Sequence, residues 1–235
     1  MFAGPNGSGK STVKSVINAE MLGYYLNPDD IEKTVRQEGR YDIRDLNLPL
    51  TESEIIAFFE NHPLLVRTGD ANMAQSIRLV EQKFIDFSAV SFNAYLSAIL
   101  TDFLRQKLIE TGLSFTFETV MSSADKVQTL QKARAAGFRN YLYYVATEDP
   151  LINLSRIRHR VRTGGHNVPD DKVIERYARS LSLLLDAVRL TSRAYIFDNS
   201  GETNLWIAEI TDGTDIELKT DFVPQWFTRA VLDKI

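Results

Sequence analysis

A phosphate-binding loop stands at the start of this chain. Its residues follow the Walker A pattern G-x-x-x-x-G-K-[ST] and continue with a threonine: Gly4, Pro5, Asn6, Gly7, Ser8, Gly9, Lys10, Ser11 and Thr12. In this pattern backbone N–H groups surround a phosphate, the lysine reaches the β- and γ-phosphates, and the serine hydroxyl takes a place on Mg²⁺. Lys10 is therefore a candidate catalytic residue, Ser11 a candidate Mg²⁺ ligand, and ATP with Mg²⁺ the expected ligand.

The sequence on either side of the loop has the order strand, loop, helix. Phe2-Ala3 is the end of an expected strand, and the residues from Thr12 to Ile17 continue as an expected helix. A helix that begins at the loop directs its free N–H groups and its dipole at the bound anion. The expected first strand is short, so it is either minimal or cut by the start of the chain.

Further along the chain, β-prone runs alternate with helical patterns. The expected strands are Tyr24–Asn27, Leu113–Thr119, Tyr141–Ala146 and Ala194–Phe197. The expected helices are Ile31–Glu38, Lys126–Ala136, Pro150–Val161 and Asp170–Leu190. This alternation predicts a three-layer α/β/α fold of the P-loop NTPase class, with a mostly parallel central sheet.

Two regions depart from this alternation. Residues 38–110 show helical periodicity and no evident strand, which predicts a helical insertion between strands two and three. Residues 204–218 contain Asp212-Gly213 between two β-prone runs, which predicts a small C-terminal hairpin. The chain is expected to form a single domain over residues 1–235.

Polar residues follow the expected strands at their carboxyl ends, where such sheets bind ligands. Asp29 and Asp30 follow the second strand, and Glu118 ends the third. One aspartate of the pair is expected to cap the next helix and the other to act as a catalytic base.

The class of reaction follows by elimination. The chain has no N-K-x-D motif for guanine and no LSGGQ signature of transporter ATPases, so a small-molecule kinase is favoured. A kinase needs arginines that neutralise the transferring phosphoryl group. Four arginines alternate along the helix expected after Pro150: Arg156, Arg158, Arg160 and Arg162. With the turn at Gly164–His166 and the next helix, they form an expected lid over residues 150–190, in which His166 is either a phosphate donor or a turn residue.

Composition excludes several classes of protein. The 235 residues carry a formal net charge of -4, so bulk attraction to nucleic acid or to anionic membranes is not expected. The chain has no cysteine, no apolar run long enough to cross a membrane and no signal-peptide pattern, so a cytoplasmic location is expected.

The motifs together resemble those of the zeta toxin family of phosphate-loop kinases. The matching segments are AGPNGSGKST at 3–12, NPDDI at 27–31, FTFETVMS at 115–122, RVRTGGHNVP at 160–169, ERYARSL at 175–181 and FDNSG at 197–201. Classical members phosphorylate a hydroxyl of UDP-N-acetylglucosamine, and an antitoxin covers their nucleotide site. The resemblance therefore implies an ATP- and Mg²⁺-dependent kinase with a UDP-sugar acceptor and an antitoxin as partner.

The resemblance also implies roles for individual residues. Asp29 matches the base for the acceptor hydroxyl, while Arg160 and Arg176 match the arginines that stabilise the phosphoryl group. Glu118 matches a substrate-contacting acid, and Thr119 and His166 complete the expected substrate-binding set. The rival hypothesis is an ATP-binding switch or interaction protein that has no phosphoryl acceptor.

Overall fold

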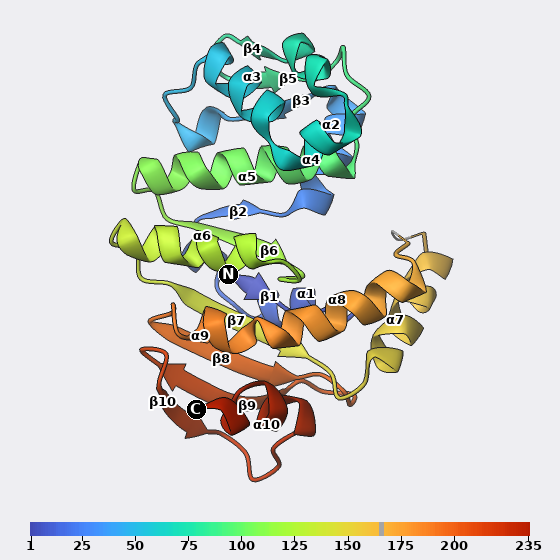
Figure 1. Cartoon of the computed structure of the whole chain (residues 1–235), viewed down its shortest axis with the longest axis vertical. Helices are drawn as coiled ribbons and strands as arrows, with labels where there is room; N and C mark the ends of the chain where they lie inside the picture. The colour runs from blue at the N-terminus through green and yellow to red at the C-terminus, as the bar shows by residue number, and fades with distance from the viewer. Residues whose placement is uncertain (165–166) are drawn as a thin grey trace. The chain divides into compact units, whose positions relative to one another are not determined.

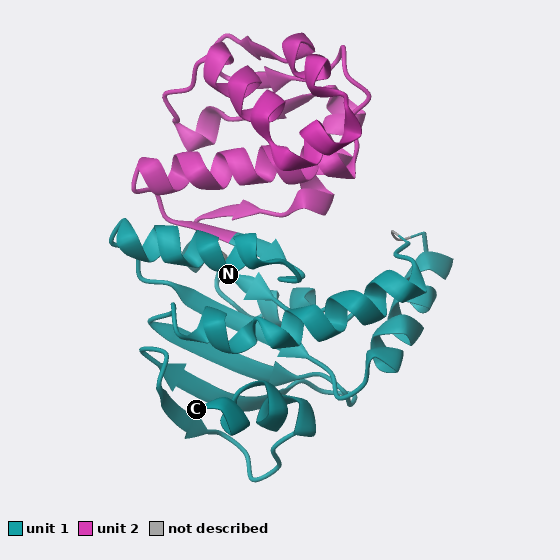
Figure 2. Cartoon of the chain, in the orientation of Figure 1, with its two compact units in different colours: residues 1–21, 117–235 teal, residues 22–116 magenta. Residues whose placement is uncertain are grey.

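A computed structural model describes residues 1–164 and 167–235 of the chain. The expected turn residue His166 lies outside the described residues. The chain divides into two compact units, shown in different colours in Figure 2. Unit 1 comprises residues 1–21 and 117–235, and unit 2 comprises residues 22–116.

Unit 1 is built on a mostly parallel sheet (Figure 1). Its strands are β1 (Phe2–Ala3), β6 (Phe115–Thr119, which begins in unit 2), β7 (Tyr141–Ala146), β8 (Arg193–Asp198), β9 (Leu205–Thr211) and β10 (Asp215–Leu218). Their order is β10-β9-β8-β7-β1-β6. The strand β1 pairs in parallel with β6 and β7, and β7 pairs in parallel with β8. The expected hairpin forms as β9 and β10, and it extends the sheet because β9 pairs antiparallel with β8.

Helices follow the parallel strands of unit 1. They are α1 (Lys10–Lys14), α6 (Ala124–Ala135), α7 (Pro150–Arg162), α8 (Asp170–Ser182), α9 (Leu184–Val188) and α10 (Gln225–Ala230), with short 3₁₀ turns at Ala19–Met21 and Leu232–Lys234. Buried aliphatic and aromatic side chains from β7 and β8 fill the core, among them Leu142, Tyr144 and Ile196. The mostly parallel α/β architecture confirms the expected fold class.

Two helix boundaries differ from the sequence-based expectation. The helix expected over 170–190 is interrupted at Leu183, which separates α8 from α9. The helix α8 begins at Asp170 as expected, with Pro169 at its N-cap. The helix α1 ends at Lys14 and not at Ile17, and the Ser15 hydroxyl donates to the Thr12 carbonyl over 2.8 Å at this end. Such side-chain bonds to the backbone favour helix termini over helix interiors.

Unit 2 contains both helices and strands. Its elements are β2 (Tyr24–Leu26), α2 (Pro28–Glu38), β3 (Arg40–Asp42), α3 (Glu52–Asn61), α4 (Pro63–Thr68), β4 (Arg78–Val80), β5 (Phe84–Asp86) and α5 (Ala94–Glu110), with 3₁₀ turns at Arg44–Leu46 and Ala71–Ser76. The strands β3, β5 and β4 form an antiparallel sheet. The expectation of a purely helical insertion over 38–110 is therefore wrong.

The hairpin of β4 and β5 explains that error. Its turn places Glu81 and Gln82 at φ values of 52° and 58°, a conformation that Asn and Gly favour. The Lys83 N–H closes the turn on the Val80 carbonyl over 2.9 Å. The usual Asn-Gly or Asp-Gly signal for such a turn is absent, so the sequence pattern around the turn predicts a helix.

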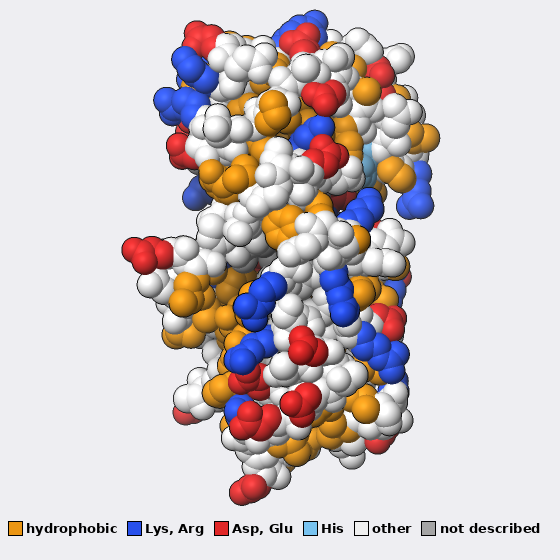
Figure 3. Space-filling model, turned by 90° about the vertical axis from the view of Figure 1, so that its left-hand side faces the viewer, with side chains coloured by type: hydrophobic (Ala, Val, Ile, Leu, Met, Phe, Trp, Pro, Cys, Tyr) orange, Lys and Arg blue, Asp and Glu red, His pale blue; other side chains and the backbone are white. Residues whose placement is uncertain are grey.

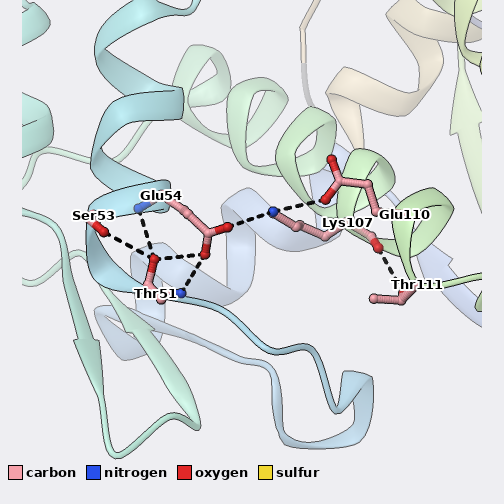
Figure 4. A network of polar contacts seen from close by, with 6 residues as sticks. All are labelled: Thr51, Ser53, Glu54, Lys107, Glu110 and Thr111. Carbon is pink, nitrogen blue, oxygen red and sulfur yellow. Dashed lines mark hydrogen bonds and ion pairs between the residues drawn. The ribbon is translucent and has the colours of Figure 1, made fainter.

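A polar network joins two helices of unit 2 (Figure 4). Thr51 caps α3 in a capping box, in which its hydroxyl accepts from the Glu54 N–H while the Glu54 carboxylate accepts from the Thr51 N–H. Lys107 on α5 donates to Glu54 over 3.1 Å and to Glu110 over 3.0 Å. The cap of α3 is thereby linked to the last turns of α5.

Charges of both signs lie on the face of the molecule that Figure 3 shows. On the face that Figure 3 shows, acidic and basic side chains are interspersed and apolar side chains lie between them. Among the described residues, no helix combines the length and apolarity that a membrane crossing requires.

Candidate functional site

The phosphate loop has a backbone that glycine alone adopts without strain. Gly4, Gly7 and Gly9 have φ values of 141°, 75° and 94°. A Cβ added at Gly4 would lie 2.0 Å from the Val145 carbonyl oxygen, and one at Gly9 would lie 2.0 Å from Nδ2 of Asn199. Larger residues are excluded both by conformation and by space.

Lys10 folds back over the loop from the first position of α1. Its side chain is 8% exposed, and Nζ donates to the Gly4 carbonyl over 2.9 Å and to the Pro5 carbonyl over 3.1 Å. A buried ammonium group interacts more strongly with an anion than one in water. Ser11 and Thr12 follow in the exposed first turn of the helix.

Polar atoms inside the loop retain hydrogen-bonding capacity. Within the described chain, Ser8 Oγ and Asn6 Oδ1 are buried side-chain atoms that lack a hydrogen-bond partner. Buried polar groups are normally satisfied, so such atoms point to a missing partner. The glycine backbone, the lysine and the free Ser8 hydroxyl fit a bound phosphate group, and Ser11 Oγ fits a Mg²⁺ held beside it.

Two asparagines that the sequence analysis did not select contact this loop. Asn153 on α7 donates from Nδ2 to the Asn6 carbonyl over 2.6 Å. Asn199, directly after β8, donates from Nδ2 to the Ser8 carbonyl over 2.7 Å. The signal that could have found Asn199 is its place at the carboxyl end of a parallel strand, where ligand sites form.

A buried carboxylate supports the segment that carries Asn199. Asp198 is 6% exposed and accepts from Trp226 Nε1 over 2.7 Å, from the Ser200 N–H over 2.9 Å and from the Ser200 hydroxyl over 3.0 Å. The Ser200 hydroxyl also accepts from the Glu148 N–H over 2.7 Å. Trp226 thus anchors α10 and joins that helix to the end of β8.

The ends of β6 and β7 lie next to the loop in the sheet. The register pairs Phe2 with Glu118 and Ala3 with Thr119, so both predicted substrate residues stand beside the strand that enters the loop. Both side chains are half-buried. The Thr119 hydroxyl accepts from the Met121 N–H over 3.0 Å, which folds the chain back after β6.

The end of β7 is held by a tyrosine of α8. The Tyr177 hydroxyl donates to the Thr147 carbonyl over 2.6 Å. Burial, followed by the charges of Glu148, Asp149 and Asp198, raises the pKa of Tyr177 above its usual range. Tyr177 therefore remains a neutral hydrogen-bond donor at the pH of the cell.

The arginine-rich helices α7 and α8 pack side by side in unit 1 (Figure 1). Their apolar contact is formed by Leu154, Ile157, Val161, Val168 and Val173. Arg158 forms an ion pair with Asp170 across the two helices. Arg160 is exposed on α7, and Arg176 is half-buried on α8.

Arg156 is a further candidate that the sequence analysis did not choose. Its Nη2 donates to the Gly201 carbonyl over 3.3 Å, in the segment that follows Asn199. Its Nη1 is buried without a hydrogen-bond partner among the described residues. This contact joins the arginine helix to the segment that supports the phosphate loop.

Asp29 belongs to unit 2, in the first turn of α2. The cap of this helix is Asn27, whose side chain accepts from the Asp29 N–H over 2.9 Å. The expectation that Asp29 or Asp30 is the cap is therefore wrong, and the reason is the better reach of the preceding asparagine to that N–H. Both carboxylates are exposed.

Comparison with known proteins decides the family. The sequence profile of the zeta toxin family matches residues 86–211, more than half of the chain. The chain belongs to the zeta toxin family. The resemblance stated from its motifs is thereby confirmed.

Similarity to individual proteins is more limited. A protein of Haemophilus influenzae described as "Uncharacterized protein" is 35% identical over 69 residues, which are 29% of this chain and 49% of that protein. The chain thus spans about half the length of the curated relative that it matches.

Solved structures show the same fold at low sequence identity. The crystal structure of AvrRxo1-ORF1:-ORF2 with ATP has a TM-score of 0.52 and 12% identity, covering 93% of this chain and 60% of that one. The structure of the same pair with sulphate ions has a TM-score of 0.53 and 12% identity, covering 94% and 60%. In each case this chain corresponds to less than two thirds of its neighbour.

Proposed function

We propose that this member of the zeta toxin family is an ATP- and Mg²⁺-dependent kinase that phosphorylates a hydroxyl group of a nucleotide-linked sugar, with UDP-N-acetylglucosamine as the first candidate. The observation that carries the proposal is the glycine loop closed by Lys10, whose ammonium group lies on the Gly4 and Pro5 carbonyls. A phosphate that enters the loop offers this buried cation stronger acceptors than two neutral carbonyls.

The donor side of the reaction belongs to the phosphate loop and the arginine helices. Lys10 binds the β- and γ-phosphates, while Ser11 holds the Mg²⁺ that neutralises their charge. Arg160 and Arg176 stabilise the negative charge that develops as the phosphoryl group leaves ATP. The neighbouring AvrRxo1-ORF1:-ORF2 crystal structure was solved with ATP, which supports the choice of donor.

The acceptor side is assigned to the residues that match the family's acceptor motifs. Asp29 takes the proton of the acceptor hydroxyl as its oxygen bonds to the γ-phosphorus, and ADP leaves as the bond to its β-phosphate oxygen breaks. Glu118, Thr119 and His166 contact the substrate. With Asn27 as the cap of α2, the Asp29 carboxylate has no capping role to compete with catalysis.

A toxin of this family has an antitoxin as its natural partner. The neighbouring AvrRxo1 structure is a complex of ORF1 with ORF2, which supports a partner protein for this chain as well. Substrates of this kind are cytoplasmic metabolites, so the cytoplasm is the proposed location.

The test is a transfer assay. Incubation with ATP, Mg²⁺ and UDP-N-acetylglucosamine is expected to add one phosphate, about 80 mass units, to the sugar nucleotide. Transfer to a different hydroxyl compound alone would reject the sugar and keep the kinase. ATP binding without transfer to any acceptor in a screen would replace the kinase with an ATP-dependent switch protein.

A further inference from the structure

The carbonyl groups on two sides of the phosphate loop are held by carboxamides. Asn153 Nδ2 donates to the Asn6 carbonyl over 2.6 Å, and Asn199 Nδ2 donates to the Ser8 carbonyl over 2.7 Å. The two asparagines come from different elements, since Asn153 lies on α7 and Asn199 follows β8. The loop is thus held by hydrogen bonds from two residues that are distant from it in sequence.

These two hydrogen bonds also determine where the neighbouring backbone N–H groups point. In a trans peptide the C=O of one residue and the N–H of the next point in opposite directions. No cis peptide bond occurs in the described part of the chain. A carbonyl of Asn6 held toward Asn153 therefore turns the Gly7 N–H the other way. In the same manner, the Ser8 carbonyl held by Asn199 turns the Gly9 N–H away from that asparagine.

Glycine by itself does not fix this orientation. Gly7 and Gly9 have φ values of 75° and 94°, and glycine populates the opposite sign of φ about as readily. An outside contact must therefore select one orientation of each peptide. At Gly9 the missing side chain makes room for that contact, because an added Cβ would lie 2.0 Å from Asn199 Nδ2.

The Asn153 carboxamide and the Asn199 backbone are themselves held by further hydrogen bonds. The Thr147 hydroxyl donates to Asn153 Oδ1, so the NH₂ group of Asn153 must face the loop. The Asn199 backbone N–H donates to the Ala146 carbonyl over 2.8 Å, which fixes that residue to the end of β7. The preceding residue, Asp198, is held by Trp226 and Ser200.

We propose that Asn153 and Asn199 are positioning residues of the nucleotide site, which hold the peptides before Gly7 and Gly9 with their N–H groups directed at a bound di- or triphosphate. Donors that are oriented before the anion arrives need no reorganisation when it binds. The proposal rests on the nucleotide-binding part of the proposed function and is independent of the acceptor.

The test replaces each donor by an acceptor of the same size. Asn153→Asp and Asn199→Asp keep the oxygen that faces away from the loop and lose the N–H group that holds the carbonyl. Asn153→Ala and Asn199→Ala are measured beside them, because they remove the donor without adding a negative charge near the nucleotide. The alanine variants also serve where an aspartate variant fails to fold.

The chain offers a matched control in Asn140. Its Nδ2 donates to the Leu130 and Leu190 carbonyls over 2.8 and 2.9 Å, and the residue is buried at the start of β7, the opposite end of the strand from Thr147. Asn140→Asp therefore loses the same kind of bond without touching the loop. It is expected to lower the melting temperature and to leave ATP affinity within about twofold of wild type.

Two readouts separate positioning from stability. Calorimetric titration with ATP and Mg²⁺, below the melting temperature of every variant, is expected to show Kd raised about 10–100-fold for each loop variant. The ¹H–¹⁵N signals of Gly7 in the Asn153 variants and of Gly9 in the Asn199 variants are expected to move in the absence of nucleotide, whereas Asn140→Asp leaves both in place.

Each outcome decides the proposal. Folded loop variants that bind ATP as wild type does would overturn it, and so would an Asn140→Asp variant with an equal loss of affinity. A wild-type protein that binds no ATP would overturn it together with the kinase. The remaining outcome is that wild type binds ATP and transfers no phosphate, while the loop variants bind ATP more weakly. That result would refute the kinase and support the positioning role.

Discussion

At the scale of single residues, the motif and its surroundings differ in how far the sequence predicts them. The Walker A spacing predicts Gly4, Gly9 and Lys10 because their roles depend on residues next to them in the chain. Asn153 and Asn199 contact the loop across 147 and 191 positions of sequence, so the loop motif does not predict these contacts, although Asn199 follows an expected strand. Their identification needs the fold.

Substitution of each aspartate of α2 by asparagine tests the role of that residue. Asp29→Asn is expected to leave ATP affinity nearly unchanged and to lower kcat by roughly 10²–10⁴-fold, the usual range for a lost general base. Asp30→Asn is the matched control. Since Asn27 caps the helix, the Asp30→Asn variant loses only a first-turn carboxylate, which contributes about 0.3–1 kcal/mol to stability. Steady-state kinetics that show the reverse order would exchange the two assignments.

At the scale of elements, patterns of period and capping predict most helices of unit 1 and miss the small sheet of unit 2. The helix α7 begins at Pro150 as expected, because Asp149 caps it and proline suits its first position. The turn at Glu81 and Gln82 has no sequence signal, because these residues adopt positive φ only under the constraint of the surrounding fold. Local pattern alone therefore predicts helix where the hairpin forms.

The two arginine helices give a prediction about charge in the transition state. Arg160→Ala and Arg176→Ala are expected to lower kcat more than they raise the KM for ATP, because a lid arginine acts on charge that develops during transfer. Arg158→Ala is the control, since its partner is Asp170 in an exposed ion pair worth about 0–1 kcal/mol. Equal kinetic losses for Arg158→Ala and Arg160→Ala would indicate that both are merely solvated surface charges.

The polar network between α3 and α5 predicts a dependence of stability on pH. Hydrogen bonds from Thr51, then from Lys107, hold the pKa of the Glu54 carboxyl below its usual range of about 4.3. Because the folded pKa is the lower one, this stabilisation is present above the unfolded value and is lost as the pH falls through the folded pKa.

Chemical denaturation at pH 7 and near pH 3 measures this effect. The free energy of unfolding of Glu54→Gln is expected to fall less between the two pH values than that of wild type. Thr51→Val is expected to reduce the same difference, because it removes the hydroxyl that donates to the Glu54 carboxylate in Figure 4. An unchanged pH dependence in both variants would refute the network's contribution.

At the scale of the whole molecule, the chain combines the unit that carries the phosphate loop with a second compact unit. Unit 1 carries the phosphate loop, Glu118 and the arginine helices, and unit 2 carries Asp29. The zeta toxin profile covers parts of both units, from residue 86 to residue 211. In the reaction proposed above, the residues that bind the donor belong to unit 1, and Asp29, the proposed base, belongs to unit 2.

The central claim is phosphoryl transfer from ATP, and labelled ATP with a panel of hydroxyl acceptors tests it most directly. Wild type with Mg²⁺ and UDP-N-acetylglucosamine is expected to yield a labelled sugar nucleotide. Lys10→Ala is expected to abolish the label without unfolding the protein, because it removes the charge that bridges the β- and γ-phosphates. Turnover in Lys10→Ala above about a tenth of wild type, or wild type that binds ATP and labels no acceptor, would contradict the claim.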